Sequence, residues 1–188
     1  GIVLIRQRTK INEELLSKLP NLKIISATGA NYGGHIDVKA CSKYKVAVAA
    51  GGSGTRSTCE LAWGLILSYM RSIPKEVLNL KSGGWQSTLG EDLSGKTLGI
   101  YAYGKIGKQM GQIAKAFNMD VLIWGRELSC EKAKEDGFTF AKNREFFFLN
   151  SDVISIHLPL KEETTGIITS VDFSLMKKSS LFVNTSRA

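Results

Sequence analysis

The sequence has few of the residues that build metal sites or disulfide frameworks. Its 188 residues include only three cysteines and two histidines. Cys41, Cys59 and Cys130 are widely spaced and form no C-x-x-C pair, which favours a reducing compartment, the cytoplasm, over a zinc site or a disulfide framework. His35 and His157 lie far apart in the sequence. We therefore expect no bound metal.

A long apolar run is also missing. The longest one, Leu61 to Met70, is too short to cross a bilayer and is interrupted by Gly64 and Ser68. The N-terminus has no signal-peptide layout, so we expect no contact with a membrane. The net charge is +8, but acidic residues are interspersed among the basic ones. This pattern favours a solvated surface over a nucleic-acid patch, while small anions would still be attracted.

What the sequence does contain is an alternation of apolar runs and helical patterns. The expected strands are residues 2–5, 23–27, 45–49, 98–102, 121–124, 138–141, 152–157 and 181–184. The expected helices are residues 12–19, a short one opening at 37–41, 57–71, 106–117, 130–136, 144–149 and 171–176, with an irregular stretch at 80–95. Regular alternation from residue 97 onward predicts a doubly wound parallel sheet, preceded by a smaller α/β unit.

Residues 97–127, T-L-G-I-Y-A-Y-G-K-I-G-K-Q-M-G-Q-I-A-K-A-F-N-M-D-V-L-I-W-G-R-E, are the most informative segment. A strand, a turn at Gly104 and Gly107, a helix and a second strand follow within about thirty residues, the layout of a dinucleotide-binding βαβ unit. The glycines would let a pyrophosphate approach the N–H groups of Lys105 and Ile106 at the helix N-terminus. The apolar positions of the helix are Ile106, Met110, Ile113, Ala114 and Phe117.

Two positions depart from the usual fingerprint. Ala102 stands where the first glycine is expected, and it adds one methyl group at a tight turn. The acidic residue expected about 20 residues after the glycines is replaced by Gly125, Arg126 and Glu127. Arg126 favours the 2′-phosphate of NADP. Glu127 could instead reach the ribose hydroxyls of NAD, or pair with Arg126, so the residues alone leave the cofactor open.

Several phrases occur in an order that is typical of one family. They are L-G-I-Y-A-Y-G-K-I-G, V-I-S-I-H-L-P-L, E-E-T-T-G-I-I and M-K-K-S-S-L-F-V-N-T-S-R-A, preceded by P-N-L-K-I-I-S-A-T-G, A-G-G-S-G-T-R-S-T-C-E-L-A-W-G-L-I-L and K-S-G-G-W-Q. Together they resemble the D-isomer-specific 2-hydroxyacid dehydrogenases, the family of phosphoglycerate dehydrogenase and glyoxylate/hydroxypyruvate reductase. The resemblance extends over nearly the whole chain.

This resemblance implies an oxidoreductase that transfers a hydride between a nicotinamide dinucleotide and a small 2-hydroxy or 2-keto acid. Residues 1–50 would be part of a flavodoxin-like substrate domain, and residues 51–188 most of an NAD(P)-binding Rossmann domain. The family default slightly favours NAD, and the helix at 57–71 resembles one used in homodimer packing. The chain looks truncated at both ends. The family's glutamate–histidine pair would lie beyond Arg187, so the fragment alone is expected to be inactive.

The resemblance also implies the site residues. Arg187 matches the catalytic arginine, whose guanidinium can fork onto the carboxylate and carbonyl of a 2-keto acid. Substrate contacts would come from the loop at Gly29, Ala30 and Asn31, with Arg6 either facing the same cleft or lying on the surface. His157 would lie near the cofactor or be structural. The expected cofactor-binding residues are Thr55, Ala102, Tyr103, Gly104, Lys105, Ile106, Gly107, Gly125, Arg126, Glu127, His157, Leu158, Pro159, Thr164, Asn184, Thr185 and Ser186.

A second class of function remains open. A dinucleotide-sensing binding protein, like the corepressor branch of the same family, would have this fold without catalysis. A full-length sequence without the glutamate–histidine pair would favour this alternative.

Overall fold

The computed structural model describes residues 2–5, 9–27, 35–51 and 54–186. These residues belong to two compact units, Gly1–Gly54 and Thr55–Ala188. The predicted substrate-site residues Arg6, Gly29, Ala30 and Asn31 and the predicted catalytic Arg187 lie outside the described residues.

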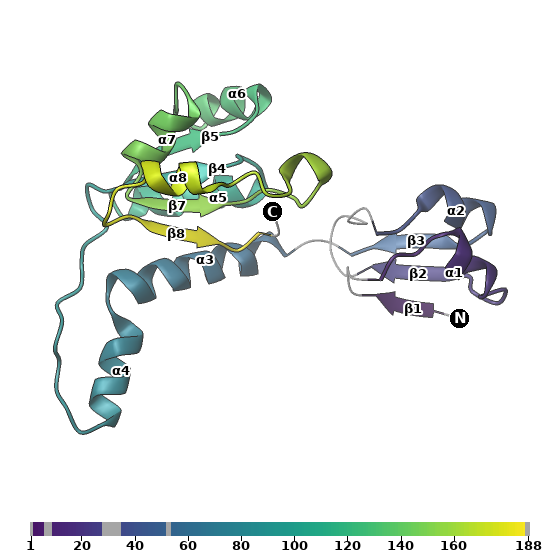
Figure 1. Ribbon diagram of the computed structural model, residues 1–188, viewed down its shortest axis with the longest axis horizontal. Coiled ribbons are helices and arrows are strands. Elements are labelled where there is room, and N and C mark those ends of the chain that lie inside the picture. Colours follow the sequence, from purple (N-terminus) through teal and green to yellow (C-terminus); the bar gives the residue numbers. More distant parts are fainter. Residues whose placement is uncertain (1, 6–8, 28–34, 52–53, 187–188) are drawn as a thin grey trace. The chain divides into compact units, whose positions relative to one another are not determined.

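The first unit is a small parallel sheet with two helices (Figure 1). Its elements are β1 (Ile2–Ile5), α1 (Glu13–Ser17), β2 (Ile24–Ala27), α2 (Val38–Lys43) and β3 (Ala47–Ala50), and the strand order is β1-β2-β3. Each helix begins at a residue whose side chain caps it, since Asn12 accepts a hydrogen bond from Leu15 N and Asp37 accepts one from Ala40 N. These are the elements that the sequence predicts for this segment.

The second unit contains a five-stranded sheet in the order β6-β5-β4-β7-β8, with every pair parallel. The strands are β4 (Thr97–Tyr101), β5 (Asp120–Trp124), β6 (Thr139–Phe140), β7 (Val153–Ile156) and β8 (Leu181–Asn184). The helices are α3 (Thr55–Met70), α4 (Ile73–Lys81), α5 (Lys105–Ala116), α6 (Glu127–Glu135), α7 (Arg144–Asn150) and α8 (Ser170–Leu175), with a 3-10 turn at Glu162–Thr164. The predicted doubly wound parallel sheet is therefore confirmed.

Helices cover both faces of this sheet. One buried cluster joins α3 and α5 to the strands through residues such as Ile66, Met110 and Ile100. A second cluster on the other face holds Phe147 and Phe148 of α7. Because apolar side chains fill both faces, the strands β4 and β7 consist mainly of buried apolar residues, and β7 also contains the buried Ser155.

The buried face of α5 differs from the predicted one. Its fully covered residues are Gly107, Met110, Gly111 and Ala114, whereas the expected Ile113 is 37% exposed. Small residues let this helix pack closely: a Cβ at Gly111 would come within 2.8 Å of the Phe138 ring. The helix is thus positioned by its glycines as much as by its apolar side chains.

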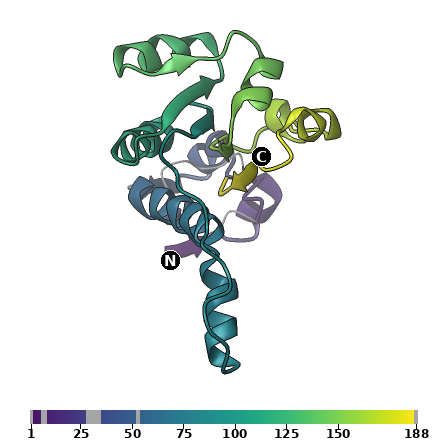
Figure 2. The ribbon, with the colours of Figure 1, turned by 90° about the vertical axis from the view of Figure 1, so that its left-hand side faces the viewer.

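Helix α4 was not predicted from the sequence. Ser72 has a left-handed backbone (φ 54°) that ends α3, and Pro74 then sits in the first turn of the new helix. None of the residues of α4 is buried. Figures 1 and 2 show α4 leading away from the sheet and the extended segment after it returning toward the sheet. We call residues 73–92 the arm.

Among the described residues, no helix is long and apolar enough to cross a membrane.

Candidate functional site

A cleft of about 530 Å³ lies at the carboxyl edge of the second unit's sheet. Its floor is formed by the last residues of two neighbouring strands, Tyr101 of β4 and Trp124 of β5. The chain continues from β4 toward β5 on one side, while β7 lies on the other side of β4. The cleft therefore opens where the strand order reverses, the place where ligands bind in open parallel sheets.

The glycine turn forms one wall. Gly104 lines the cleft and precedes α5 in an extended conformation, and a Cβ built on it would meet no atom of the described residues within 4 Å. A Cβ on Gly107 would lie 2.8 Å from the carbonyl oxygen of Ala102 and 3.1 Å from Ile100 Cγ2. Gly104 thus leaves room for a ligand, and Gly107 lets the helix pack against its own strand.

The N-terminus of α5 provides the groups that such a ligand would bind. No side chain caps this end, and there is no acidic residue in its first turn. The first backbone hydrogen bond of the helix runs from Lys108 N to Gly104 O at 2.9 Å. The N–H groups of Lys105 and Ile106 come before this bond and have no helical acceptor. An oxyanion at this position would gain both the hydrogen bonds and the dipole.

Ala102 keeps the geometry of the missing first glycine. Its φ is +74°, in the left-handed region that disfavours a Cβ. Its N–H donates to Trp124 O at 2.8 Å, so the turn is tied to the end of β5. The alanine is therefore held in a strained conformation by the surrounding structure, at a cost of about 1–2 kcal/mol.

Tyr103 fixes the turn from the other side. The ring is buried against Phe138, and the hydroxyl donates to Asp136 Oδ2 at 2.7 Å. Lys108 Nζ binds the same carboxylate at 2.6 Å. The bonds from Lys108 and Tyr103 lower the pKa of Asp136, while burial and this carboxylate raise the pKa of Tyr103. The turn is thus held by an ionised acceptor at the end of α6.

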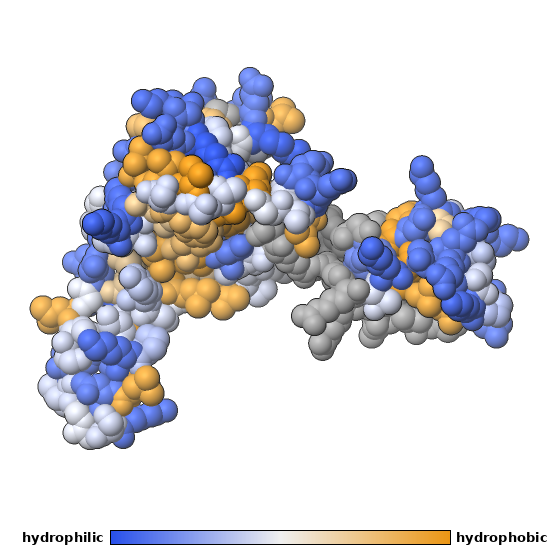
Figure 3. All heavy atoms as spheres, viewed as in Figure 1, coloured by the Kyte–Doolittle hydropathy of each residue, from blue (hydrophilic) through white to orange (hydrophobic). Residues whose placement is uncertain are grey.

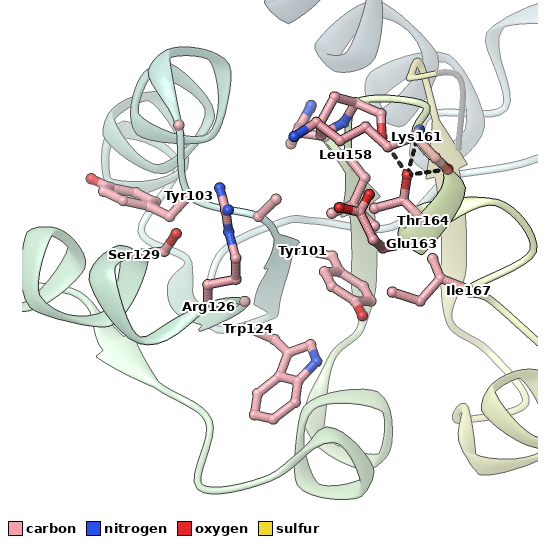
Figure 4. A pocket seen from close by; sticks show the side chains of 15 residues that line it. Tyr101, Tyr103, Trp124, Arg126, Ser129, Leu158, Lys161, Glu163, Thr164 and Ile167 are labelled. Atoms are coloured by element: carbon pink, nitrogen blue, oxygen red, sulfur yellow. Dashed lines mark hydrogen bonds between the residues drawn. The ribbon is translucent and has the colours of Figure 1, made fainter. Parts of the chain in front are cut away.

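Opposite the glycine turn, the segment after β7 forms a second wall (Figure 4). The residues of this wall that line the cleft are His157, Leu158, Pro159, Lys161, Glu163, Thr164 and Ile167. Thr164 braces the segment internally, since its hydroxyl accepts from Lys161 N at 2.8 Å and donates to Pro159 O at 2.5 Å. The wall is therefore a folded turn rather than a loose loop.

His157 is a largely buried member of this wall. Its Nε2 lies 3.0 Å from Ser155 Oγ, and its buried Nδ1 has no hydrogen-bond partner among the residues that the structure describes. Burial lowers its pKa to about 4. The imidazole is therefore neutral at physiological pH and is suited to hydrogen bonding rather than to carrying charge.

Arg126, Ser129 and Gly125 line the cleft beside the end of β5. Figure 4 shows Arg126 and Ser129 across the cleft from Lys161 and Thr164. Glu127 is exposed in the first turn of α6 and is not among the lining residues. Of the two charged residues at this place, Arg126 lines the cleft and Glu127 does not.

The cleft brings together part of the predicted cofactor set. Ala102, Tyr103, Gly104, Gly125, Arg126, His157, Leu158, Pro159 and Thr164 all line it, whereas Thr55, Lys105, Ile106, Gly107, Glu127, Asn184, Thr185 and Ser186 do not. Thr55 begins α3 and accepts a hydrogen bond from Gln109 Nε2 at 3.3 Å. Asn184 ends β8, and its Oδ1 accepts from Ser186 N at 2.9 Å.

Six lining residues were not predicted: Tyr101, Trp124, Ser129, Lys161, Glu163 and Ile167. Tyr101 and Trp124 could have been found, because each is the last residue of a strand that neighbours the switch point. The residues of the wall after β7 do not end a strand next to the switch point. Nothing in the sequence of this short turn shows which of its side chains point toward the cleft.

The strand order and the glycine turn at the switch point define a Rossmann-type dinucleotide-binding unit. The open space over Gly104 is where such a unit receives a pyrophosphate, so the residues fit this kind of ligand. The chain belongs to the family described as D-isomer specific 2-hydroxyacid dehydrogenase, whose NAD binding domain matches residues 63–188.

Three relatives show the extent of the similarity. D-3-phosphoglycerate dehydrogenase of Bacillus subtilis (strain 168) is 35% identical over 188 residues, covering 98% of this chain and 35% of its own length. Glyoxylate reductase of Thermococcus litoralis is 34% identical over 188 residues, covering 95% of this chain and 56% of its own. The crystal structure of a phosphoglycerate oxidoreductase from Vibrio cholerae o395 is 46% identical with a TM-score of 0.88, covering 100% of this chain and 60% of that one. The chain thus spans about a third to three fifths of the length of these relatives.

Proposed function

We propose that the whole protein transfers a hydride between a nicotinamide dinucleotide and C2 of a small 2-hydroxy or 2-keto acid. The observation that carries this proposal is the open space over Gly104 at the switch point, which would accommodate a pyrophosphate against the N-terminus of α5. The family and the names of the relatives support the class of substrate. The dinucleotide would supply the hydride, and the chain would orient it and exclude water.

The substrate site stays a prediction. We propose that residues 1–50 are part of the substrate domain, with Gly29, Ala30, Asn31 and Arg6 near the acid, and that residues 51–188 are part of the dinucleotide domain. Arg187 would bind the carboxylate through two parallel N–H bonds. In the whole protein, Arg187→Lys should then lower kcat/KM strongly with little change in dinucleotide affinity, because lysine keeps the charge but loses the fork.

The cofactor is NAD or NADP. The residues that line the cleft indicate which of the two the site would prefer. The expected slight preference for NAD depends on Glu127 reaching the ribose hydroxyls. Arg126 lines the cleft and Glu127 does not, which supports a site that accepts the 2′-phosphate of NADP. Arg126→Ala should then weaken NADPH binding tenfold or more while leaving NADH unchanged. If Glu127→Gln instead reduces the difference between the affinities for NADH and NADPH, this result would support a preference for NAD.

We propose that the protein forms a homodimer through the arm. Leu78, Leu80, Trp85 and Leu89 of the arm are all more than half exposed, at 68%, 53%, 78% and 83%. Apolar residues on the arm are also visible in Figure 3. A nine-residue helix without a buried residue gains little stability from apolar packing in its own unit, so an apolar partner surface would stabilise it.

Hydrogen bonds within the arm hold its two parts together. Glu76 accepts from Ser87 N at 3.0 Å and from Thr88 Oγ1 at 2.6 Å, which ties the extended segment to α4. A prearranged apolar surface suits binding to a second copy of the chain. Leu78→Ser should convert dimer to monomer in sedimentation experiments. The matched control is Leu128→Ser, which removes a leucine that is 74% exposed on α6; equal effects of the two variants would contradict an arm-mediated dimer.

The compartment proposed is the cytoplasm. Cys41 and Cys59 are buried free thiols, which a reducing compartment preserves.

The test of the proposed reaction is oxidation of NADH and NADPH by the whole protein with glyoxylate, hydroxypyruvate or pyruvate. Turnover that yields the D-hydroxy acid supports the proposal. Tight dinucleotide binding without turnover of any 2-keto acid would overturn it in favour of a binding protein of the same fold.

A further inference from the structure

Arg144, the first residue of α7, lies at the centre of a partly buried hydrogen-bond network. Its Nε donates to Asp172 Oδ1 at 2.6 Å and its Nη2 to Asp172 Oδ2 at 2.8 Å, which is the bidentate arrangement of a guanidinium on a carboxylate. Asp172 is 3% exposed. Its Oδ2 also accepts from Thr169 N at 2.7 Å, so the carboxylate is fixed by the start of α8 as well.

The same guanidinium reaches two residues that line the cleft, although it does not line the cleft itself. Its Nη1 donates to the hydroxyl of Tyr101 at 3.2 Å, and its Nη2 donates to the carbonyl oxygen of Ile167. The guanidinium also lies over the ring of Tyr101, 5.7 Å from its centroid. One side chain thus connects the floor of the cleft at β4 to the far end of the wall after β7.

The half of the cleft that these two residues line can be assigned from the fold. If the pyrophosphate lies over Gly104, the ribose next to it faces the end of β5 at Gly125 and Arg126. The base then enters the space between Trp124 and the wall. Tyr101 and Ile167 line this part of the cleft (Figure 4).

We propose that Arg144 is a positioning residue for the adenosine half of the dinucleotide site, acting through Tyr101 and Ile167; the proposal rests on the function proposed above. Arginine is suited to this role because its planar fork can bind a carboxylate, a carbonyl and a hydroxyl at once. A tyrosine oxygen that accepts from a cation keeps its own proton for a second partner, so Tyr101 can still donate toward the cleft.

The test compares ligands that carry the two halves separately. ADP-ribose contains the adenosine half, and reduced nicotinamide mononucleotide contains the other half. Arg144→Lys keeps a cation beside Asp172 but loses the fork, and it should weaken ADP-ribose binding tenfold or more while changing binding of the mononucleotide less than twofold. Tyr101→Phe keeps the ring and should weaken ADP-ribose alone, by a smaller factor.

The matched control is Lys177→Met. It removes an ion pair of similar length, Lys177 Nζ to Asp152 at 2.7 Å, at the opposite edge of the same sheet, where Asp152 also accepts from Thr97 N. This variant should lower the melting temperature and leave both ligand affinities unchanged. A selective loss of ADP-ribose binding in Arg144→Lys alone, with the control unaffected, supports a positioning role.

The opposite outcomes are distinct. Equal weakening of both ligands in Arg144→Lys, or the same selective loss in Lys177→Met, would show a merely structural role. If Arg144→Lys does not fold, unchanged ADP-ribose binding in Tyr101→Phe overturns the proposal. Failure of the unmodified chain to bind NADH and NADPH would instead refute the proposed function, and this inference with it.

Discussion

Alanine substitution at the two glycines of the turn should separate ligand binding from folding. Gly104 has an extended backbone with φ −116°, and a Cβ built on it meets nothing within 4 Å. Gly104→Ala therefore introduces no clash with the described residues. Restricting the unfolded chain favours the variant by about 0.4–1 kcal/mol, but alanine is a poorer N-cap residue than glycine, so little net change in stability is expected. The added methyl group would occupy the space that a pyrophosphate needs. We expect at least a tenfold loss of dinucleotide affinity, about 1.4 kcal/mol.

Gly107→Ala should behave in the opposite way. Its Cβ would lie 2.8 Å from Ala102 O, a backbone atom that cannot rotate away, and 3.1 Å from Ile100 Cγ2. Overpacking of this kind costs about 1–3 kcal/mol, and the better helix propensity of alanine returns up to about 1 kcal/mol. A net loss of stability is expected, with lower affinity only as a consequence of a shifted turn.

Thermal unfolding and calorimetric titration with NADH and NADPH measure the two effects. The reasoning is refuted if Gly104→Ala binds both dinucleotides with the affinity of the unmodified chain, because the open space would then not be the pyrophosphate site. A Gly104→Ala protein that is destabilised as strongly as Gly107→Ala would show that the glycine is structural. The bulkier Gly104→Val should abolish binding.

Further predictions concern the turn and its neighbours. Ala102→Gly should stabilise the protein by about 0.5–1 kcal/mol in urea unfolding, because it relieves the left-handed φ of +74° against a smaller entropic cost; a less stable variant would contradict the strain. His157 has its pKa lowered to about 4 by burial, so the unfolded chain takes up its proton first as the pH falls. Stability should therefore decrease between about pH 6.5 and 4, by about 2 kcal/mol from pH 7 to pH 5, and His157→Leu should remove this part of the pH dependence. Tyr103→Phe should cost about 1 kcal/mol by removing the 2.7 Å bond to Asp136; an unchanged unfolding midpoint would show that this bond adds nothing.

The sequence predicted two kinds of element: strands and helices with buried apolar residues, and a turn in which a side chain larger than glycine would clash. The alternation of strands and helices between β4 and β8 was predicted because apolar strands between amphipathic helices fit a parallel sheet. The glycine turn was predicted because its spacing has a steric cause, visible at Gly107. The resemblance to a family supplied its name, and the comparisons confirm the membership.

The remaining features depend on contacts that local patterns do not encode. Helix α4 was not predicted, although Ile73, Val77 and Leu80 have the i, i+4, i+7 spacing of an apolar helix face. None of its residues is buried in its own unit, so this face has no core there to pack against. Ile113 was expected to be covered, yet α5 packs through Gly107 and Gly111. Arg144 bonds to Tyr101 across 43 positions of the sequence, and no spacing rule indicates such a pair.

The most direct test of the central claim is a crystal structure of the chain with a bound nicotinamide dinucleotide. The account predicts pyrophosphate oxygens within about 3.2 Å of the backbone nitrogens of Lys105 or Ile106, over Gly104, with the adenosine between Arg126 and the wall that contains Ile167. A dinucleotide bound at this edge of the sheet with its pyrophosphate away from Gly104, or bound elsewhere on the unit, would contradict it.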